Sequence, residues 1–395
     1  MTTNLLPAIL LAGPPHSGKS VLAYHLSRRL REAQVAHILL RAAPDGEGDW
    51  FYESPEEVRM RQRQKGSYTG PLIEALQQAI SRRHLPMLVD IGGRPREIQF
   101  RLLDACTHVI HLWREEDDRQ TWARWLEERG LIPIASLRSR LVPPDHLELT
   151  QGSLSGTITG LERAGPRLGP AFGAVLERVT GICAYPPGAL EAEHLRQAPT
   201  DAAVITVAEL AHDLGLATAG EEVWWEPTHL ARLRELLPPG EPVALYGRGP
   251  AWLYAAVAIH AAPAAFHLFD ARFHGWMTPP EVRSSARDRC RNGEFTLTVE
   301  EDDEQIRLRF IRHQKYYLIR PARVYVPPLP ADRGVLLDGP MPFWLVTALA
   351  RALRHHPRLA IYEPRTQRGV TFWEHGALPA RPGAPEPQTS AGERG

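Results

Sequence analysis

The fold is decided by the stretch Pro7-Ala8-Ile9-Leu10-Leu11-Ala12-Gly13-Pro14-Pro15-His16-Ser17-Gly18-Lys19-Ser20. Residues 7–12 are apolar and predict a buried strand. Residues 13–20 fit the pattern G-x-x-x-x-G-K-[ST], and a helix is expected over residues 18–33. A loop of this kind between a strand and a helix turns its backbone N–H groups toward a phosphate.

The loop predicts a site for ATP and Mg²⁺, with five ATP-binding residues: Gly13, Ser17, Gly18, Lys19 and Ser20. In this pattern the lysine reaches the β- and γ-phosphates and the serine supplies a magnesium ligand. Asp90 ends the apolar run 87–89, where a second acidic residue would orient the metal. We therefore expect Ser20 and Asp90 to be the metal ligands of this site. The alternative for Asp90 is a carboxylate that only ends a strand.

Strand and helix patterns alternate along the rest of the N-terminal part. Apolar runs at 35–41, 86–91 and 108–113 alternate with helical segments at 56–65, 71–83 and 115–129, which predicts a parallel sheet. The glycine-punctuated segment 151–181 is expected to be mostly helical. Arg59 and Arg63, and later Arg119 and Arg124, resemble the lid arginines of small-molecule kinases; the alternative is a solvated charged face.

Composition limits the class of protein. The 395 residues carry 46 basic and 46 acidic side chains, and 43% are hydrophobic. At roughly 150 residues per domain, this length predicts two or three domains. The hydrophobic content excludes a wholly disordered chain, and zero net charge argues against a protein that coats long nucleic acid. The three cysteines, at 106, 183 and 290, have neither the spacing of a zinc site nor that of a disulfide pattern, so we expect a cytoplasmic protein. The apolar N-terminal run is too short for a membrane span, so we expect no membrane partner.

The second part of the chain contains an internal repeat. One copy reads Pro242-Val-Ala-Leu-Tyr-Gly-Arg-Gly-Pro-Ala-Trp-Leu253, and the other reads Gly334-Val-Leu-Leu-Asp-Gly-Pro-Met-Pro-Phe-Trp-Leu345, at an offset of about 92 residues. Each copy continues through an alanine-rich helix into a strand that ends acidic-x-Arg, at residues 270–272 and 363–365. The matching order of these elements favours a duplication.

These patterns predict an α/β protein in three parts. A P-loop NTPase or kinase-like domain with a parallel sheet spans 1–220. A tandem, pseudo-dimeric α/β module spans 221–376, with halves at about 222–290 and 293–376. Residues 377–395 are rich in Pro, Gly, Ala and Glu and are expected to be a disordered tail.

The first copy predicts a βαβ unit with a polar edge. In such a unit the glycine turn, the helix N-terminus, Asp270 and Arg272 all lie at the carboxyl ends of the strands. The turn amides and Arg272 could hold a phosphate, and Asp270 a divalent metal. His260 lies near the other end of the helix, so it would have to serve a site formed with a partner or with the other copy. The alternative is a histidine that packs in the core.

The repeat resembles the CRISPR-associated ring nucleases of the Csx-three family. The resemblance rests on Gly247-Arg-Gly-Pro-x-Trp-Leu253, His260 and Asp270-x-Arg272, and in the second copy on Gly339-x-x-Pro-x-Trp-Leu345, His355-His356-Pro357 and Glu363-Pro-Arg365. The resemblance implies binding and cleavage of cyclic tetra-adenylate, the second messenger of type III CRISPR systems, with Mn²⁺ and with a site completed by oligomerisation. Fused forms with an N-terminal P-loop ATPase domain belong to the same family picture.

The resemblance also implies roles for individual residues. The catalytic roles fall on His260, Asp270 and Arg272 in the first copy, and on His355 or His356, Glu363 and Arg365 in the second. Turn residues Gly247, Arg248, Gly249 and Gly339 would contact the ligand, and Asp270 would hold the metal. Neither copy keeps the family's Asp-Pro-Arg, because one has Asp-Ala-Arg and the other Glu-Pro-Arg. We expect chemistry in the first copy and ligand binding in the second.

Three functions remain open from the sequence. The first is a homo-oligomeric enzyme that binds ATP and degrades cyclic oligoadenylate. The second is a sensor that binds the ring and regulates an ATPase without cutting. The third is a P-loop small-molecule kinase whose C-terminal half serves only to oligomerise.

Overall fold

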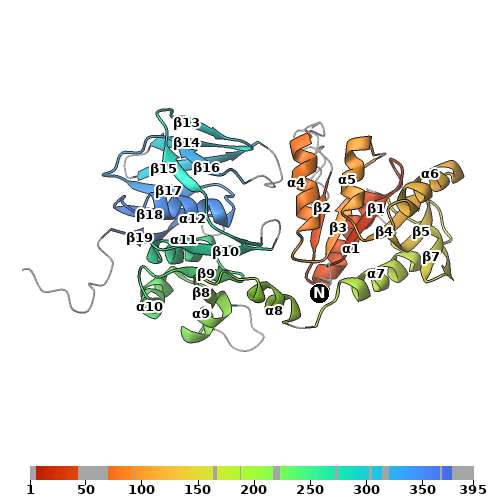
Figure 1. Cartoon of the computed structure of the whole chain (residues 1–395), viewed down its shortest axis with the longest axis horizontal. Helices are drawn as coiled ribbons and strands as arrows, with labels where there is room; N and C mark the ends of the chain where they lie inside the picture. The colour runs from red at the N-terminus through yellow and green to blue at the C-terminus, as the bar shows by residue number, and fades with distance from the viewer. Residues whose placement is uncertain are drawn as a thin grey trace, which may run out of the picture.

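The computed structural model describes residues 6–42, 70–93, 95–162, 167–186, 188–216, 223–271, 275–301, 305–313, 320–364 and 367–375 (Figure 1). Arg59, Arg63, Arg272, Arg365 and the tail 377–395 lie outside the described residues. The expected α/β class with parallel strands is confirmed.

A seven-stranded sheet with the order β2-β3-β1-β4-β5-β7-β6 forms the N-terminal unit. Its neighbouring strands are parallel, except for the β6–β7 hairpin. The strands are β1 (Ala8–Ala12), β2 (Ile38–Arg41), β3 (Met87–Asp90), β4 (His108–Trp113), β5 (Ile132–Arg140), β6 (His146–Thr150) and β7 (Ser153–Thr159). β7 shows that the helical expectation for 151–181 was wrong in its first part, because the run Ser-Leu-Ser-Gly-Thr-Ile-Thr is rich in residues that favour strands.

Helices cover both faces of this sheet. α1 (Lys19–Glu32) and α7 (Pro170–Cys183) pack on one face. The other face is covered by α4 (Gly70–Ser81), α5 (Phe100–Asp104) and α6 (Glu116–Glu127). The 3₁₀ turn η1 (Glu97–Gln99) leads directly into α5. α8 (Ala189–Arg196) then leads to the second unit (Figure 1).

The second unit contains two sheets with a shared strand pattern. In each of these sheets, three neighbouring strands are parallel and a fourth is antiparallel at one edge. In the first sheet the parallel strands are β8, β9 and β10, and the antiparallel strand is β11. In the second sheet they are β15, β17 and β18, with β19 antiparallel. The first sheet has β8 (Ala203–Thr206), β9 (Val243–Tyr246), β10 (Phe266–Asp270) and β11 (Gly275–Met277). The second has β13 (Arg289–Asn292), β14 (Phe295–Glu301), β15 (Gln305–Arg312), β17 (Gly334–Asp338), β18 (Arg358–Glu363) and β19 (Arg368–Glu374), while β12 (Glu281–Ser284) pairs with β16 (Arg323–Val326).

The unit boundary differs from the expected position near residue 220. β8 pairs with β9 in the second unit, and α9 (Val207–Asp213) follows it there. Because β8 is a strand of the same sheet as β9 and β10, residues 203–206 belong with the second unit. The remaining helical turns of this part are η2 (Pro227–His229) and α10 (Leu230–Leu236).

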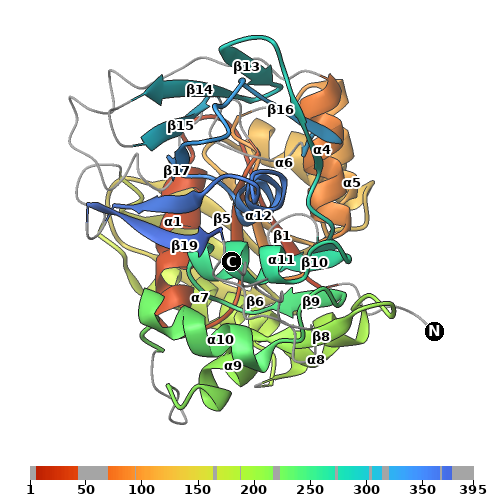
Figure 2. The same ribbon diagram turned by 90° about the vertical axis from the view of Figure 1, so that its left-hand side faces the viewer.

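Two apolar helices join the halves into one core. α11 (Ala251–His260) connects β9 to β10, and α12 (Phe343–Ala352) connects β17 to β18. They lie side by side in both views (Figures 1 and 2), with the rings of Tyr254 and Phe343 4.5 Å apart. Nine residues of α11 are buried, as expected for a helix that is apolar on every side. Among the described residues, no helix is long and apolar enough to cross a bilayer.

Candidate functional site

The loop between β1 and α1 has the backbone that its glycines predict. Gly13 and Gly18 have φ values of 137° and 87°, in the region that favours glycine. A Cβ atom on Gly13 would lie 1.8 Å from the carbonyl oxygen of Leu112 on β4. Position 13 therefore requires glycine, and the loop is held tightly against the carboxyl end of β4.

Lys19 begins α1 and points back into this loop. Its Nζ donates to the carbonyl oxygen of Pro14 at 2.6 Å and lies 3.4 Å from the hydroxyl of Ser17. Burial lowers the pKa of Lys19 to about 8, and the carboxylate of Asp90 opposes that shift. A phosphate in the loop would offer this ammonium group stronger, charge-assisted acceptors than a carbonyl oxygen.

Asp90 lies beside the loop, at the end of β3, where the sequence predicted it. Its Oδ2 accepts from Nη1 of Arg41 at 3.0 Å, and its Oδ1 accepts from the backbone N–H of Gly92 at 3.2 Å. Both charged side chains are buried. Arg41 was not predicted as a site residue, because an arginine at the end of a strand is unremarkable in a chain with so many arginines.

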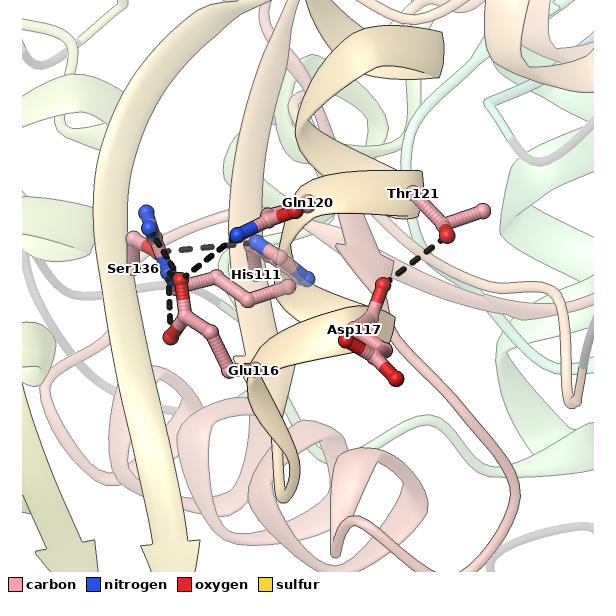
Figure 3. A network of polar contacts seen from close by, with 7 residues as sticks. His111, Glu116, Asp117, Gln120, Thr121 and Ser136 are labelled. Carbon is pink, nitrogen blue, oxygen red and sulfur yellow. Dashed lines mark hydrogen bonds and ion pairs between the residues drawn. The ribbon is translucent and has the colours of Figure 1, made fainter.

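The end of β4 adds a second group of side chains to this edge of the sheet. His111 is buried, and its Nδ1 lies 3.5 Å from the hydroxyl of Ser136 on β5 (Figure 3). Burial, together with the positive charges of Arg119 and Lys19, lowers the pKa of His111 to about 4. Arg119 pairs with Glu116 on α6, and its guanidinium lies 5.8 Å from the Trp113 ring centroid. Arg119 therefore faces this edge, whereas Arg124 is exposed.

The two repeat copies have nearly identical turns. Gly247 and Gly339 have φ values of 115° and 109°, directly after β9 and β17. Pro250 precedes α11 and has φ −70° and ψ 152°. Pro342 precedes α12 and has φ −69° and ψ 153°. Arg248 in the first turn is exposed. In both halves a helix N-terminus therefore meets a glycine turn at the carboxyl ends of parallel strands.

The predicted acids and histidines lie at opposite ends of each half. Asp270 ends β10 and Glu363 ends β18, at the carboxyl edge. His260 ends α11, is buried, and donates from Nε2 to the carbonyl oxygen of Leu237 at 2.6 Å. His356 is also buried and donates from Nδ1 to the carbonyl oxygen of Arg333 at 3.0 Å. His355 is exposed, with Nδ1 3.1 Å from the carbonyl oxygen of Ala352.

The N-terminal unit meets the first half at a cluster that we call the joint cluster: His84, His194, Tyr246, Phe269 and Trp276. His194 lies on α8, donates from Nε2 to the carbonyl oxygen of His84 at 2.7 Å, and accepts at Nδ1 from the Tyr246 hydroxyl at 2.9 Å. The indole N–H of Trp276 donates to the carbonyl oxygen of His194 at 2.7 Å. Burial lowers the pKa of His194 and raises the pKa of Tyr246 to about 12. The sequence did not reveal this cluster, because its members come from distant segments.

The second half carries polar residues at the equivalent positions. Asp338 precedes Gly339 as Tyr246 precedes Gly247, and Tyr362 precedes Glu363 as Phe269 precedes Asp270. Nη1 of Arg307 lies 3.3 Å from Oδ2 of Asp338, and its guanidinium lies 5.9 Å from the Tyr362 ring centroid. Asp338 and Arg307 were not singled out from the sequence.

No three His, Cys, Asp or Glu side chains gather into a metal-binding group within the described part of the chain. Two hollows of the described residues lie elsewhere. One of about 640 Å³ lies between α9 and the end of α10, and one of about 330 Å³ lies near Pro263 and Arg351. Neither contains Asp270, Glu363 or the phosphate loop.

Comparison with known proteins adds one finding. A family model described as CRISPR-associated protein (Cas_csx3) matches residues 318–376. The matched stretch is similar to this CRISPR-associated family and spans less than a fifth of the chain. It contains β16, β17, α12, β18 and β19, and thus the turn at Gly339 and the acid Glu363. No curated protein matches the chain.

Proposed function

We propose that the chain binds and degrades cyclic oligoadenylate, most readily cyclic tetra-adenylate, and that an ATP-binding P-loop domain regulates this activity. The observation that carries the proposal is the Csx3 region at 318–376, whose turn geometry recurs in the first half. The two halves would then act as a pseudo-dimer around the packed helices α11 and α12. A CRISPR-related role rests on the match itself, and the reaction rests on the resemblance of the motifs.

The binding step would use the carboxyl edges of the two halves. The glycine turns at Gly247 and Gly339 and the N-termini of α11 and α12 present backbone N–H groups, which suit the phosphates of a cyclic oligonucleotide. Arg272 and Arg365 would add charge-assisted hydrogen bonds. Because each half contributes one such edge, a ring with repeated phosphates would be held at two places.

The cleavage step needs a proton acceptor near the scissile phosphate. His260 and His356 are buried at the opposite ends of their helices, so neither reaches the acid of its own half. Because these two histidines are buried, a second copy of the chain would have to bring its exposed His355 to this edge, in line with the homo-oligomer expected from the sequence. Mn²⁺ would neutralise charge on the phosphate, with Asp270 as its protein ligand. Among the described residues, Asp270 belongs to no group of three His, Cys, Asp or Glu side chains, so this chain alone does not offer a complete manganese site there.

ATP would bind at the N-terminal loop. Lys19 and the loop N–H groups would hold the β- and γ-phosphates, and the hydroxyl of Ser20, at the start of α1, fits a Mg²⁺ ligand. Magnesium would neutralise the phosphates there. Asp90 is already engaged by Arg41 and Gly92, so its part in holding the metal is indirect at most.

A product assay tests the proposal. The full-length protein is incubated with labelled cyclic tetra-adenylate, with Mn²⁺ or with EDTA, and with or without ATP. The proposal expects linear products that require Mn²⁺ and that Lys19→Ala changes in rate. Binding without any product under all conditions would contradict cleavage, and absence of binding would contradict the whole proposal.

A sensor that binds the ring without cutting it is the second candidate. The separation of histidine and acid within each half favours it, as does the lack of a three-residue metal group among the described side chains. In the same assay, a sensor would bind the ring, release no product, and change the rate of ATP hydrolysis. The kinase alternative predicts phosphate transfer to an added acceptor, independent of the ring.

A further inference from the structure

We propose that the free edge of β6 is a contact surface for a second copy of this chain, so that the N-terminal sheets of two copies join antiparallel into one. The inference goes beyond the proposed function, because it assigns an interface to the N-terminal unit that involves neither nucleotide nor ring. β6 (His146–Thr150) is the last strand of its sheet, and β7 is its neighbour. β7 lies at the end of the molecule farthest from the second unit (Figure 1), so this edge is remote from the joint cluster and from both repeat copies.

The backbone of β6 presents hydrogen-bonding groups on its outer side. A two-residue turn at 151–152, with φ values of 50° and 83°, joins β6 to β7, and Thr150 and Ser153 close it. The closing pair of such a hairpin is hydrogen-bonded, so the backbone groups of every second residue back from Thr150 point toward β7. The N–H and C=O groups of Leu147 and Leu149 then point outward, where the described chain provides them no backbone partner. A row of such groups is a template for a further strand.

This edge lacks the devices that commonly protect an edge strand from pairing. β6 contains neither lysine nor proline, and its register with β7 runs without a bulge. The side chain of Leu149 is 65% exposed, and Leu141 and Val142, which precede the strand, are exposed as well. A flat edge beside exposed apolar side chains is stabilised when another chain covers it.

The side chains of β6 favour a copy of the same strand as the partner. Nε2 of His146 lies 3.0 Å from Oε1 of Glu148, and both side chains are exposed on one face of the strand. If two copies pair about a two-fold axis with Leu147 opposite the partner's Leu147, each His146 faces the partner's Glu148. This register also places the outward backbone groups of Leu147 opposite each other, as a hydrogen-bonded pair requires. The neighbouring register, with Leu147 opposite the partner's Leu149, would place the two Glu148 carboxylates opposite each other, which is destabilising.

Sedimentation velocity of the full-length protein over a range of concentrations tests this inference. We expect the wild type to dimerise, and Glu148→Lys to raise the dissociation constant about tenfold, because two favourable cross-strand pairs become unfavourable. The double variant His146→Glu/Glu148→Lys restores opposite groups across the two-fold axis and should recover the wild-type dissociation constant. Glu300→Lys is the matched control, since Glu300 is an exposed strand residue of the second unit that pairs with Arg309.

Disulfide trapping tests the register. Directly opposite residues of a non-hydrogen-bonded pair have Cα atoms about 4.5 Å apart, within reach of a disulfide. His146→Cys and Glu148→Cys should therefore cross-link when the two variants are mixed, and neither should cross-link alone. The native cysteines are buried and do not compete.

Three results would overturn the inference. The first is a wild type that stays monomeric at all concentrations. The second is a dimer whose dissociation constant Glu148→Lys leaves unchanged, because its interface would lie elsewhere. The third is a cross-link in Glu148→Cys alone, because the two carboxylates would then face each other and the charge pattern would not select this partner.

Discussion

Removal of the His194 side chain should loosen the joint between the two units without unfolding either. The ring of His194 is buried and uses both nitrogens, one toward Tyr246 and one toward His84. In His194→Ala, the hydroxyl of Tyr246 and the carbonyl group of His84 lose these partners. An unsatisfied buried group costs about 1–3 kcal/mol, so two of them would weaken docking by about 2–6 kcal/mol. The lower half of this range applies because both hydrogen bonds are only partly buried.

Native-state hydrogen exchange measures this effect where it occurs. A loss of about 3 kcal/mol corresponds to roughly 100-fold faster exchange in segments exposed only when the units separate. We expect this acceleration in β11, which carries Gly275 and Trp276. The core strand β1 should be unchanged, because its neighbours are β3 and β4.

His212→Ala is the matched control, since His212 is an exposed histidine on α9. Two results would refute the reasoning. Unchanged exchange in β11 would mean that the contacts of His194 do not hold the units together. Equal acceleration in β1 and β11 would mean that the variant destabilises the whole chain and that the joint is not a separate unit of stability.

Three further predictions concern the two sites. Lys19→Ala should abolish ATP binding, as measured by titration. The melting temperature should stay within a few degrees of the wild type, because the side chain faces the loop. Unchanged ATP affinity would refute the assignment of this loop as the ATP site. The rates of ring cleavage by Asp270→Asn and Glu363→Gln should show which half is catalytic. A fall in the rate of about 10²- to 10⁴-fold in only one variant identifies the half that carries that residue as the catalytic one. Wild-type rates in both variants would contradict the roles implied by the family resemblance. Stability should fall as pH drops from about 6.5 toward 4, because the pKa of His111 is about 4 in the folded chain and near 6.5 when unfolded. Between these pH values the unfolded chain binds a proton at His111 before the folded chain does, which lowers the free energy of unfolding by about 3 kcal/mol at pH 4. Chemical denaturation should show that His111→Gln does not have this loss of stability.

Local patterns predicted much of the fold. The strands β1, β3 and β4 and the glycine turn between β1 and α1 were predictable because their signals, apolar runs and glycines, lie within a few residues of one another. The β6–β7 hairpin was missed because a glycine in Ser153–Thr159 was taken as a break in a helix, although it occupies a strand position with φ of 137°. β8 was assigned to the wrong side of the boundary because its pairing with β9 spans about 40 residues.

The sites were predictable only where one segment contains them. The turns at Gly247 and Gly339 were found from their spacing, and the structure gives them the same backbone. Arg41 was missed because it meets Asp90 only when β2 and β3 pair, and Asp338 because its partner Arg307 lies on another strand. Contacts of that kind follow from strand order, which a single sequence does not reveal.

The turns of the two halves have matching backbone conformations, but the outer surfaces beside them differ. Leu245 and Leu268 face the common core with α11, so their neighbours Tyr246 and Phe269 face outward and form part of the joint cluster. In the second half, Leu337 and Ile361 face the core, and the outward neighbours are Asp338 and Tyr362. Aromatic side chains suit a buried contact with another part of the chain, and a charged pair suits water or a polar ligand.

If the two halves arose by duplication, as the repeat predicts, this difference gives them different roles. The first half keeps Asp270 at its carboxyl edge while its outer face docks onto the N-terminal unit through His194. The second half, which the Csx3 model matches, keeps a polar outer face beside Glu363. A ligand at the carboxyl edges would therefore contact one half that is fixed to the N-terminal unit, for which we propose ATP binding, and one half that is not. Through the first half, ring binding could alter the N-terminal unit, and for this reason the joint variant His194→Ala should also weaken any effect of ATP on ring cleavage.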